Sequence, residues 1–261
     1  MANKDLTYNF KNKNVLVLGG SGLVGKSVIS NLIKANANIV NIDLKNITTK
    51  YKKYFFYKFD FQEKKNIKNI LMKNINFSHI DILINTLYPK NNNWSNSNFN
   101  NISYNDLEQN SNINLYSILW SSKVVADLMK KNLKGSIILM NSIYGIRGQD
   151  LSIYKNTKIK ENFSYSVMKG AITNGVRQMA SFYGKYNIRI NSVCAGGLIG
   201  ENSMTNKKLS KNFIKNYSSR CPLNRLGTAD EISDVILFLA SDHSSYITGT
   251  NLVVDGGWTS V

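Results

Sequence analysis

The chain has 261 residues, enough for one sizeable core, and nothing in it requires a second part, so we expect one domain over residues 1–261. No run of about 18 to 20 apolar residues is present and the first residues are polar, so we expect no membrane span, no signal peptide and a cytoplasmic location. The formal net charge is +17, but the lysines are spread along the whole chain, which argues against a nucleic-acid partner.

Short apolar runs alternate with segments of helical spacing along the chain. This alternation is typical of a parallel sheet with crossover helices, and continuous apolar runs indicate strands buried on both faces. We therefore predict an α/β fold with a doubly wound, seven-stranded parallel sheet and helices on both faces. The predicted strands are residues 14–18, 38–43, 54–59, 81–85, 136–140, 188–193 and 251–254.

Two stretches interrupt this alternation. They lie near residues 88–101, which are rich in asparagine, and near 144–162. Each follows the carboxyl end of a predicted strand, which is the edge where open α/β sheets bind ligands. We expect both to be loops that shape a substrate pocket, and we also expect a substrate loop near residues 195–220.

The first predicted strand runs directly into Gly19-Gly20-Ser21-Gly22-Leu23-Val24-Gly25, and helical spacing follows over residues 26–35. Small residues let the backbone approach a pyrophosphate, and the N-terminus of the helix stabilises its negative charge. The alternative is a tight turn without a ligand. The context of strand and helix favours a dinucleotide.

Asp43 ends the next predicted strand, about 20 residues further on, where a carboxylate can accept hydrogen bonds from the adenosine ribose. The same carboxylate should repel the 2′-phosphate of NADP. Lys45 is close enough in sequence to act as a phosphate partner. We therefore predict NAD as the cofactor, with NADP as the alternative.

Tyr165 and Lys169 are four residues apart, so in a helix they lie on one face about one turn apart. A neighbouring ammonium favours the phenolate and should move the tyrosine pKa from about 10 towards neutral pH. Such a pair also arises by chance, so it needs support from elsewhere in the chain. Cys194 and Cys221 lack the spacing of a metal site or a disulfide framework, and we expect no metal.

Ser142 follows the fifth predicted strand and Asn114 lies in the preceding helix. With the glycine loop and the tyrosine–lysine pair, their order resembles that of the short-chain dehydrogenase/reductase family. The resemblance spans residues 13–258 and includes Asp60 and the motifs at 79–85, 191–193, 222–227, 238–242, 247–249 and 253–257.

The resemblance implies a Rossmann fold and an NAD(P)-dependent oxidoreductase that acts on a carbonyl or a secondary alcohol. Tyr165 would exchange the proton with the substrate oxygen, and Lys169 would tune the tyrosine and hold the nicotinamide ribose. Ser142 would orient the substrate, and Asn114 would hold a relay water. It also implies a homo-oligomer, a tetramer or a dimer. The expected cofactor residues are Gly19, Ser21, Gly22, Leu23, Val24, Gly25, Asp43, Asp60, Phe61, Asn85, Tyr165, Lys169 and Gly196.

Some positions depart from the family pattern. Leu18 stands where a threonine is usual and Leu23 where a glycine is usual. The usual Asn-Asn-Ala-Gly is Asn85-Thr86-Leu87-Tyr88, and the usual Pro-Gly is Ala195-Gly196. We expect pyrophosphate binding to survive these changes, whereas the pose of the nicotinamide does not follow from the family pattern.

The gap between Ser142 and Tyr165 is long for the family, and with Tyr88-Pro89 and Ser142-Ile143-Tyr144-Gly145 it is similar to dehydrogenases described as flagellin modification protein A. This implies a small anionic substrate, a sugar phosphate or nucleotide sugar in surface-glycan synthesis. Lysines in the insertion and over residues 207–215 could attract that anion, or could reflect composition alone. The alternatives are a 3-oxoacyl-[acyl-carrier-protein] reductase and a non-catalytic dinucleotide-binding scaffold.

Overall fold

Seven parallel strands form one sheet in the computed structural model, which describes residues 8–62, 67–74, 77–91, 93–200 and 211–261. Their order across the sheet is β3-β2-β1-β4-β5-β6-β7, so the winding reverses between β1 and β4, where such sheets open a binding crevice. The strands are β1 (Asn14–Leu18), β2 (Asn38–Asp43), β3 (Tyr54–Lys58), β4 (Ile82–Asn85), β5 (Gly135–Ser142), β6 (Ile188–Ala195) and β7 (Asn251–Val254).

The predicted sheet is confirmed. The bounds of β1, β2 and β7 agree with the predicted ranges; β3, β4 and β6 differ by one or two residues at one end, and β5 differs at both ends. Ser142 is therefore the last residue of β5 and does not follow it.

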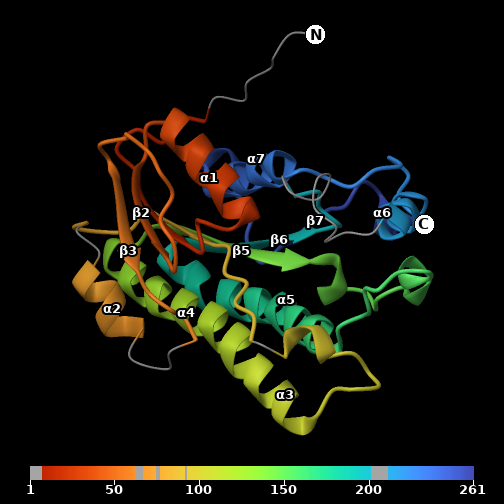
Figure 1. The fold of residues 1–261 in the computed structure, drawn as a ribbon. Coiled ribbons are helices and arrows are strands. Elements are labelled where there is room, and N and C mark those ends of the chain that lie inside the picture. Colours follow the sequence, from red (N-terminus) through yellow and green to blue (C-terminus); the bar gives the residue numbers. More distant parts are fainter. Residues whose placement is uncertain (1–7, 63–66, 75–76, 92, 201–210) are drawn as a thin grey trace.

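Helices cover both faces of the sheet (Figure 1). Helices α1 and α7 lie on one face, and α2, α4 and α5 lie on the other. The helices are α1 (Leu23–Lys34), α2 (Ile67–Asn74), α3 (Tyr104–Asn110), α4 (Ser117–Met129), α5 (Phe163–Tyr183), α6 (Lys211–Ser218) and α7 (Ala229–Ala240).

Alternate residues of β1 divide between two hydrophobic clusters, as the pleat of a strand requires. Val15 and Val17 pack on the face that carries α1 and α7. Leu16 and Leu18 pack on the face that carries α4 and α5. All four side chains are fully buried, which explains why the strand contains an unbroken apolar run.

A third hydrophobic cluster lies beyond the carboxyl ends of β5 and β6. It joins Ile143 and Ile153, from the insertion near residues 144–162, to Tyr217 of α6 and to Trp258. Short 3-10 turns at Ile143–Gly145 and Leu151–Tyr154 give this insertion regular structure, and the stretch near 88–101 contains another at Trp94–Asn96. Helix α6 falls within the expected substrate loop, whose residues 201–210 lie outside the described residues.

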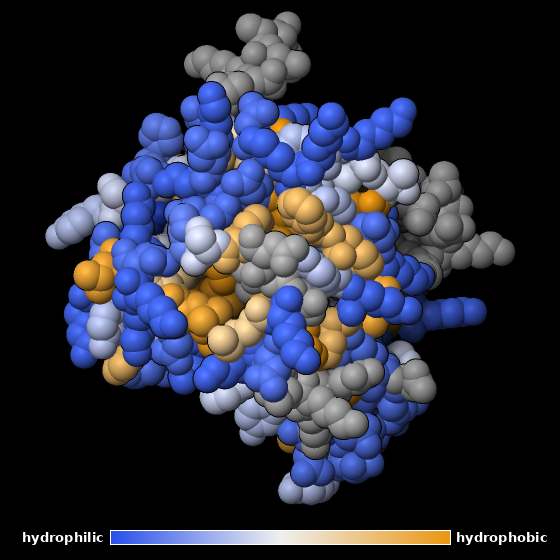
Figure 2. Space-filling model, turned by 90° about the vertical axis from the view of Figure 1, so that its left-hand side faces the viewer, coloured by the Kyte–Doolittle hydropathy of each residue, from blue (hydrophilic) through white to orange (hydrophobic). Residues whose placement is uncertain are grey.

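The side of the molecule that carries β3 and α2 is covered mainly by hydrophilic side chains, around a hollow where apolar side chains are exposed (Figure 2). This appearance agrees with the spread of lysines along the sequence. In the part of the chain that is described, no helix combines the length and apolar character needed to cross a membrane.

Candidate active site

The loop between β1 and α1 has glycines where a side chain would not fit. Gly19 has φ +80°, in the left-handed region that favours glycine, and a Cβ there would lie 2.9 Å from the backbone nitrogen of Leu87. A Cβ on Gly25 would collide with the carbonyl oxygen of Gly19. Gly22 precedes α1, and no side chain caps the helix. The first backbone N–H groups of α1 therefore remain available to an anion such as a pyrophosphate.

Asp43 is held beside this loop at the end of β2. Its carboxylate accepts hydrogen bonds from the backbone N–H groups of Ser21 at 2.8 Å and Leu44 at 2.6 Å. Asn41, fully buried in the same strand, accepts a hydrogen bond from the N–H of Gly20 at 3.1 Å. Asn41 was not among the predicted site residues, although an amide inside an apolar strand is a signal, since buried polar groups need partners.

A cavity of about 640 Å³ extends from the glycine loop and Asp43 to Tyr165 and Lys169. This volume is within the range of small-molecule sites. Every predicted cofactor residue except Asn85 lines it. The lining also includes residues that the sequence argument did not name as cofactor residues, among them Leu44, Lys45, Thr86, Leu87, Tyr88, Asn141 and Leu198. The shape and donor set fit an NAD(P) molecule.

Asn85 has a structural role instead of a place in the cavity. Its amide nitrogen donates to the carbonyl oxygen of Ile118 at 3.2 Å and to the hydroxyls of Ser121 and Ser122 at 3.1 and 3.2 Å. Its oxygen accepts from the N–H of Leu87 at 3.3 Å. The side chain is buried and ties the end of β4 to α4, so its role as a cofactor residue stays a prediction.

Tyr165 and Lys169 lie one turn apart at the start of α5, as predicted. Asn162 caps the helix by accepting a hydrogen bond from the N–H of Tyr165 at 2.9 Å. The Lys169 ammonium donates to the carbonyl oxygen of Met140 at 3.0 Å and lies 5.7 Å from the centre of the Tyr165 ring. Burial lowers the pKa of Lys169 to about 8, because a charged group is disfavoured away from water.

The expected lowering of the Tyr165 pKa is wrong for this structure. Burial raises the pKa of Tyr165, and the hydrogen bond with Ser142 opposes that rise. Desolvation is the largest cause of the raised pKa, and the Lys169 ammonium is directed at the carbonyl oxygen of Met140. The phenol is therefore protonated at neutral pH, and it is suited to donating a proton.

Ser142 and Asn114 flank the pair without lining the cavity. The Ser142 hydroxyl accepts from the N–H of Tyr144 at 3.1 Å and is hydrogen-bonded with Tyr165. Asn114 lies in a π-helical turn, Ser111–Tyr116, which packs against α5. Its amide nitrogen donates to the carbonyl oxygen of Asn110 at 3.3 Å. Such turns inside α-helices are frequent at functional sites.

Aromatic rings surround Tyr165, and the sequence argument did not foresee this wall. The ring centres of Tyr88, Trp94 and Tyr144 lie 5.5, 6.3 and 6.3 Å from that of Tyr165. They come from the two stretches expected to shape the pocket. Burial raises the pKa of both Tyr88 and Tyr144, so the wall is uncharged.

Gln149 joins the insertion to α5. Its amide nitrogen donates to the carbonyl oxygen of Asn162 at 2.7 Å and to the Ser166 hydroxyl at 2.8 Å. Its oxygen accepts from the Tyr154 hydroxyl at 2.7 Å. The insertion lysines Lys155, Lys158 and Lys160 are exposed, and none of them lines the described cavity.

Comparisons with known proteins show the family of this chain. A family model described as "Enoyl-(Acyl carrier protein) reductase" matches residues 31–259. The chain belongs to the short-chain dehydrogenase/reductase family. It is therefore an oxidoreductase that acts on a CH–OH or C=O group with NAD(P).

Three relatives illustrate the range of this family. The "Post-translational flagellin modification protein A" of Campylobacter coli is 26% identical over 259 residues, which cover 95% of this chain and 98% of that protein. The "3-oxoacyl-[acyl-carrier-protein] reductase FabG" of Buchnera aphidicola is 27% identical over 255 residues, with 97% and 91% covered. The crystal structure of a short-chain dehydrogenase from Leptospira borgpetersenii with bound NAD+ is 28% identical, with a TM-score of 0.84 over 99% of this chain and 97% of that one.

Proposed function

We propose that this dehydrogenase/reductase uses NAD in preference to NADP and acts on a sugar phosphate or a nucleotide sugar in surface-glycan synthesis. The observation that carries the proposal is one cavity with Asp43 at one end and the Tyr165–Lys169 pair at the other. Bound NAD(P) would supply or accept the hydride, and the protein positions the substrate and transfers the proton.

Tyr165 is the proton donor in the direction of carbonyl reduction, because burial keeps its phenol protonated at neutral pH. Ser142 holds the substrate oxygen next to that phenol. Lys169, with a pKa of about 8, is charged at neutral pH and provides an ammonium at the base of the site. Burial of the phenol and the ammonium strengthens these polar interactions.

The NAD preference is supported by the geometry of Asp43. Two backbone N–H groups hold its carboxylate beside the glycine loop, where a 2′-phosphate would meet a fixed negative charge. Calorimetry with NADH and NADPH should show tighter NADH binding by the native protein. Asp43→Ala should weaken NADH binding and reduce the difference in affinity between NADH and NADPH. Tighter binding of NADPH by the native protein would contradict the preference.

The substrate class is supported by the similarity to flagellin modification protein A and by the aromatic wall, since aromatic faces pack against the C–H groups of sugar rings. A panel of sugar phosphates and nucleotide sugars should include one that changes NADH absorbance in the presence of the enzyme. Tyr165→Phe should abolish that change and retain NADH binding.

The similarity to FabG supports a second candidate, reduction of a 3-oxoacyl thioester. Turnover of a 3-oxoacyl thioester in preference to every sugar compound would favour it. NADH binding without turnover of either class would favour the non-catalytic scaffold, although Ser142, Tyr165 and Lys169 are all retained.

We also propose a homo-oligomer, a dimer or a tetramer. Tyr116, Trp120 and Phe182 are exposed on the surface formed by α4, α5 and the π-helical turn, and exposed apolar residues that gather on one surface mark interfaces. Light scattering should report a multiple of 29.4 kDa that falls for Trp120→Glu and not for Leu223→Glu. A native monomer would contradict this. The cytoplasmic location stays a prediction.

A further inference from the structure

A second cavity, of about 680 Å³, lies at the opposite edge of the sheet from the cofactor cavity. It is lined by residues at the starts of β4, β5 and β6, by residues 8–13 and by the turn that follows α7. This volume also falls in the range of small-molecule sites. In α/β sheets of this kind ligands bind at the carboxyl edge, so a cavity of this size at the amino edge needs its own explanation.

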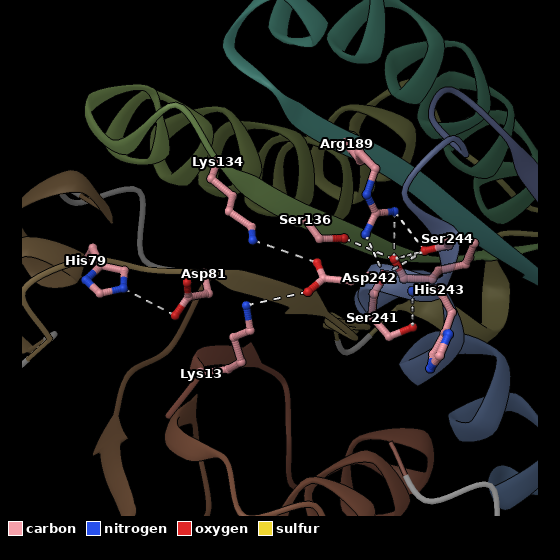
Figure 3. A network of polar contacts seen from close by, with 11 residues as sticks. Lys13, His79, Asp81, Lys134, Ser136, Arg189, Ser241, Asp242, His243 and Ser244 are labelled. Atoms are coloured by element: carbon pink, nitrogen blue, oxygen red, sulfur yellow. Dashed lines mark hydrogen bonds and ion pairs between the residues drawn. The ribbon is translucent and has the colours of Figure 1, made fainter. Parts of the chain in front are cut away.

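Two ammonium groups in this cavity are directed at a single carboxylate (Figure 3). The Nζ atoms of Lys13 and Lys134 each lie 3.9 Å from an oxygen of Asp242. These distances are too long for hydrogen bonds, which require about 2.7 to 3.2 Å. The Asp242 side chain is 76% exposed, so water competes for it and it is free to turn away. The two cations therefore flank a position where an anionic oxygen is held only weakly.

The other charged groups of the cavity already have partners. Arg189 donates to the carbonyl oxygens of Leu239 at 3.0 Å and Ser241 at 2.9 Å, so its charge offsets the negative end of α7. Asp81 accepts from the N–H of Asn14 at 2.8 Å and lies 3.4 Å from the Nε2 atom of His79. Among the described lining residues, Asp242 is thus the carboxylate that opposes the two lysines.

We propose that this cavity is a second ligand site, which binds a small phosphate monoester with its phosphate between Lys13 and Lys134. A phosphate has three terminal oxygens, so it can accept hydrogen bonds from both ammoniums at once, which the Asp242 carboxylate does not do here. The rings of Tyr8 and His243, whose centres are 6.1 Å apart, form a surface for the organic part. The two cavities lie at opposite edges of the sheet, so this site can be filled together with the cofactor site.

The test is calorimetric titration of inorganic phosphate into the protein saturated with NADH, so that the glycine loop is already filled. We expect one phosphate per chain. The double variant Lys13→Ala/Lys134→Ala should weaken binding at least about tenfold. Lys52→Ala/Lys53→Ala is the matched control, because these exposed lysines precede β3 at the same edge but lie outside the cavity. It should bind phosphate like the native protein.

Asp242→Asn separates this proposal from a general effect of charge. Removing the competing carboxylate should tighten phosphate binding several-fold, whereas Lys134→Arg should retain it. Phenyl phosphate should bind more tightly than inorganic phosphate, since its ring can pack against Tyr8 and His243. The proposal is overturned by three results: no saturable phosphate binding, an equal loss in the Lys52/Lys53 control, or weaker binding by Asp242→Asn.

Discussion

Replacement of Lys169 by an uncharged residue should stabilise the protein at neutral pH. Burial lowers the pKa of Lys169 from its ordinary value of 10.5 to about 8. At about 1.36 kcal/mol per pH unit, holding the ammonium in the folded protein below pH 8 costs about 3 kcal/mol. Lys169→Met retains the length of the side chain and removes this cost, but leaves the carbonyl oxygen of Met140 without its partner, a loss of about 1 kcal/mol. We expect a net gain of about 2 kcal/mol near pH 7.

The sign of the pH dependence follows from the same shift. Between pH 8 and 10.5 the unfolded chain still binds the Lys169 proton and the folded chain does not, so the native protein gains stability as pH rises. The advantage of Lys169→Met should therefore disappear over that interval. Urea unfolding at several pH values measures the difference in unfolding free energy between the variant and the native protein. Lys26→Met, at an exposed lysine, is the control. A variant less stable than the native protein at pH 7, or an advantage that does not change with pH, would refute the reasoning.

Three further substitutions test other parts of the site. Gly25→Ala should destabilise the protein by about 1–3 kcal/mol in urea unfolding, because its Cβ would collide with the Gly19 carbonyl oxygen, while Gly184→Ala, with open space around it, should not. Tyr165→Phe should lower kcat at least about 100-fold with NADH affinity unchanged by calorimetry, and a small loss would mean that another group transfers the proton. Gln149→Ala should raise KM more than it lowers kcat and speed proteolysis of the insertion, because its four side-chain hydrogen bonds are lost; an unchanged KM would show that the insertion does not contact the substrate.

The sheet was predictable because its signals are local. A strand buried on both faces must be apolar throughout, and the run at residues 14–18 shows this without any knowledge of its neighbours. The glycine loop and the pair Tyr165 and Lys169 are also local, since they depend on spacing within one loop and one helical turn. Helix α6 was not predicted, because its packing partners Ile143 and Ile153 come from a distant segment.

The role of polar residues inside strands was harder to predict. Asn41 and Asn85 both interrupt apolar runs, and the sequence alone does not distinguish a ligand contact from a structural hydrogen bond. The family pattern assigned Asn85 to the cofactor, yet its amide is used by α4. Asn41 had no assigned role, yet it positions the glycine loop. The difference depends on which backbone groups the fold leaves without partners, and those are set by contacts between distant segments.

The pKa of Tyr165 shows why the chemistry of the site needed the structure. Spacing predicts that Lys169 is near, but the aromatic rings that remove water come from two loops distant in sequence. Desolvation by burial raises the pKa of the phenol and lowers that of the ammonium, so it moves both groups towards their neutral forms. The same burial that destabilises the folded chain through Lys169 keeps the phenol protonated for reduction. Loosening of the insertion should therefore stabilise the charged lysine and weaken proton transfer together.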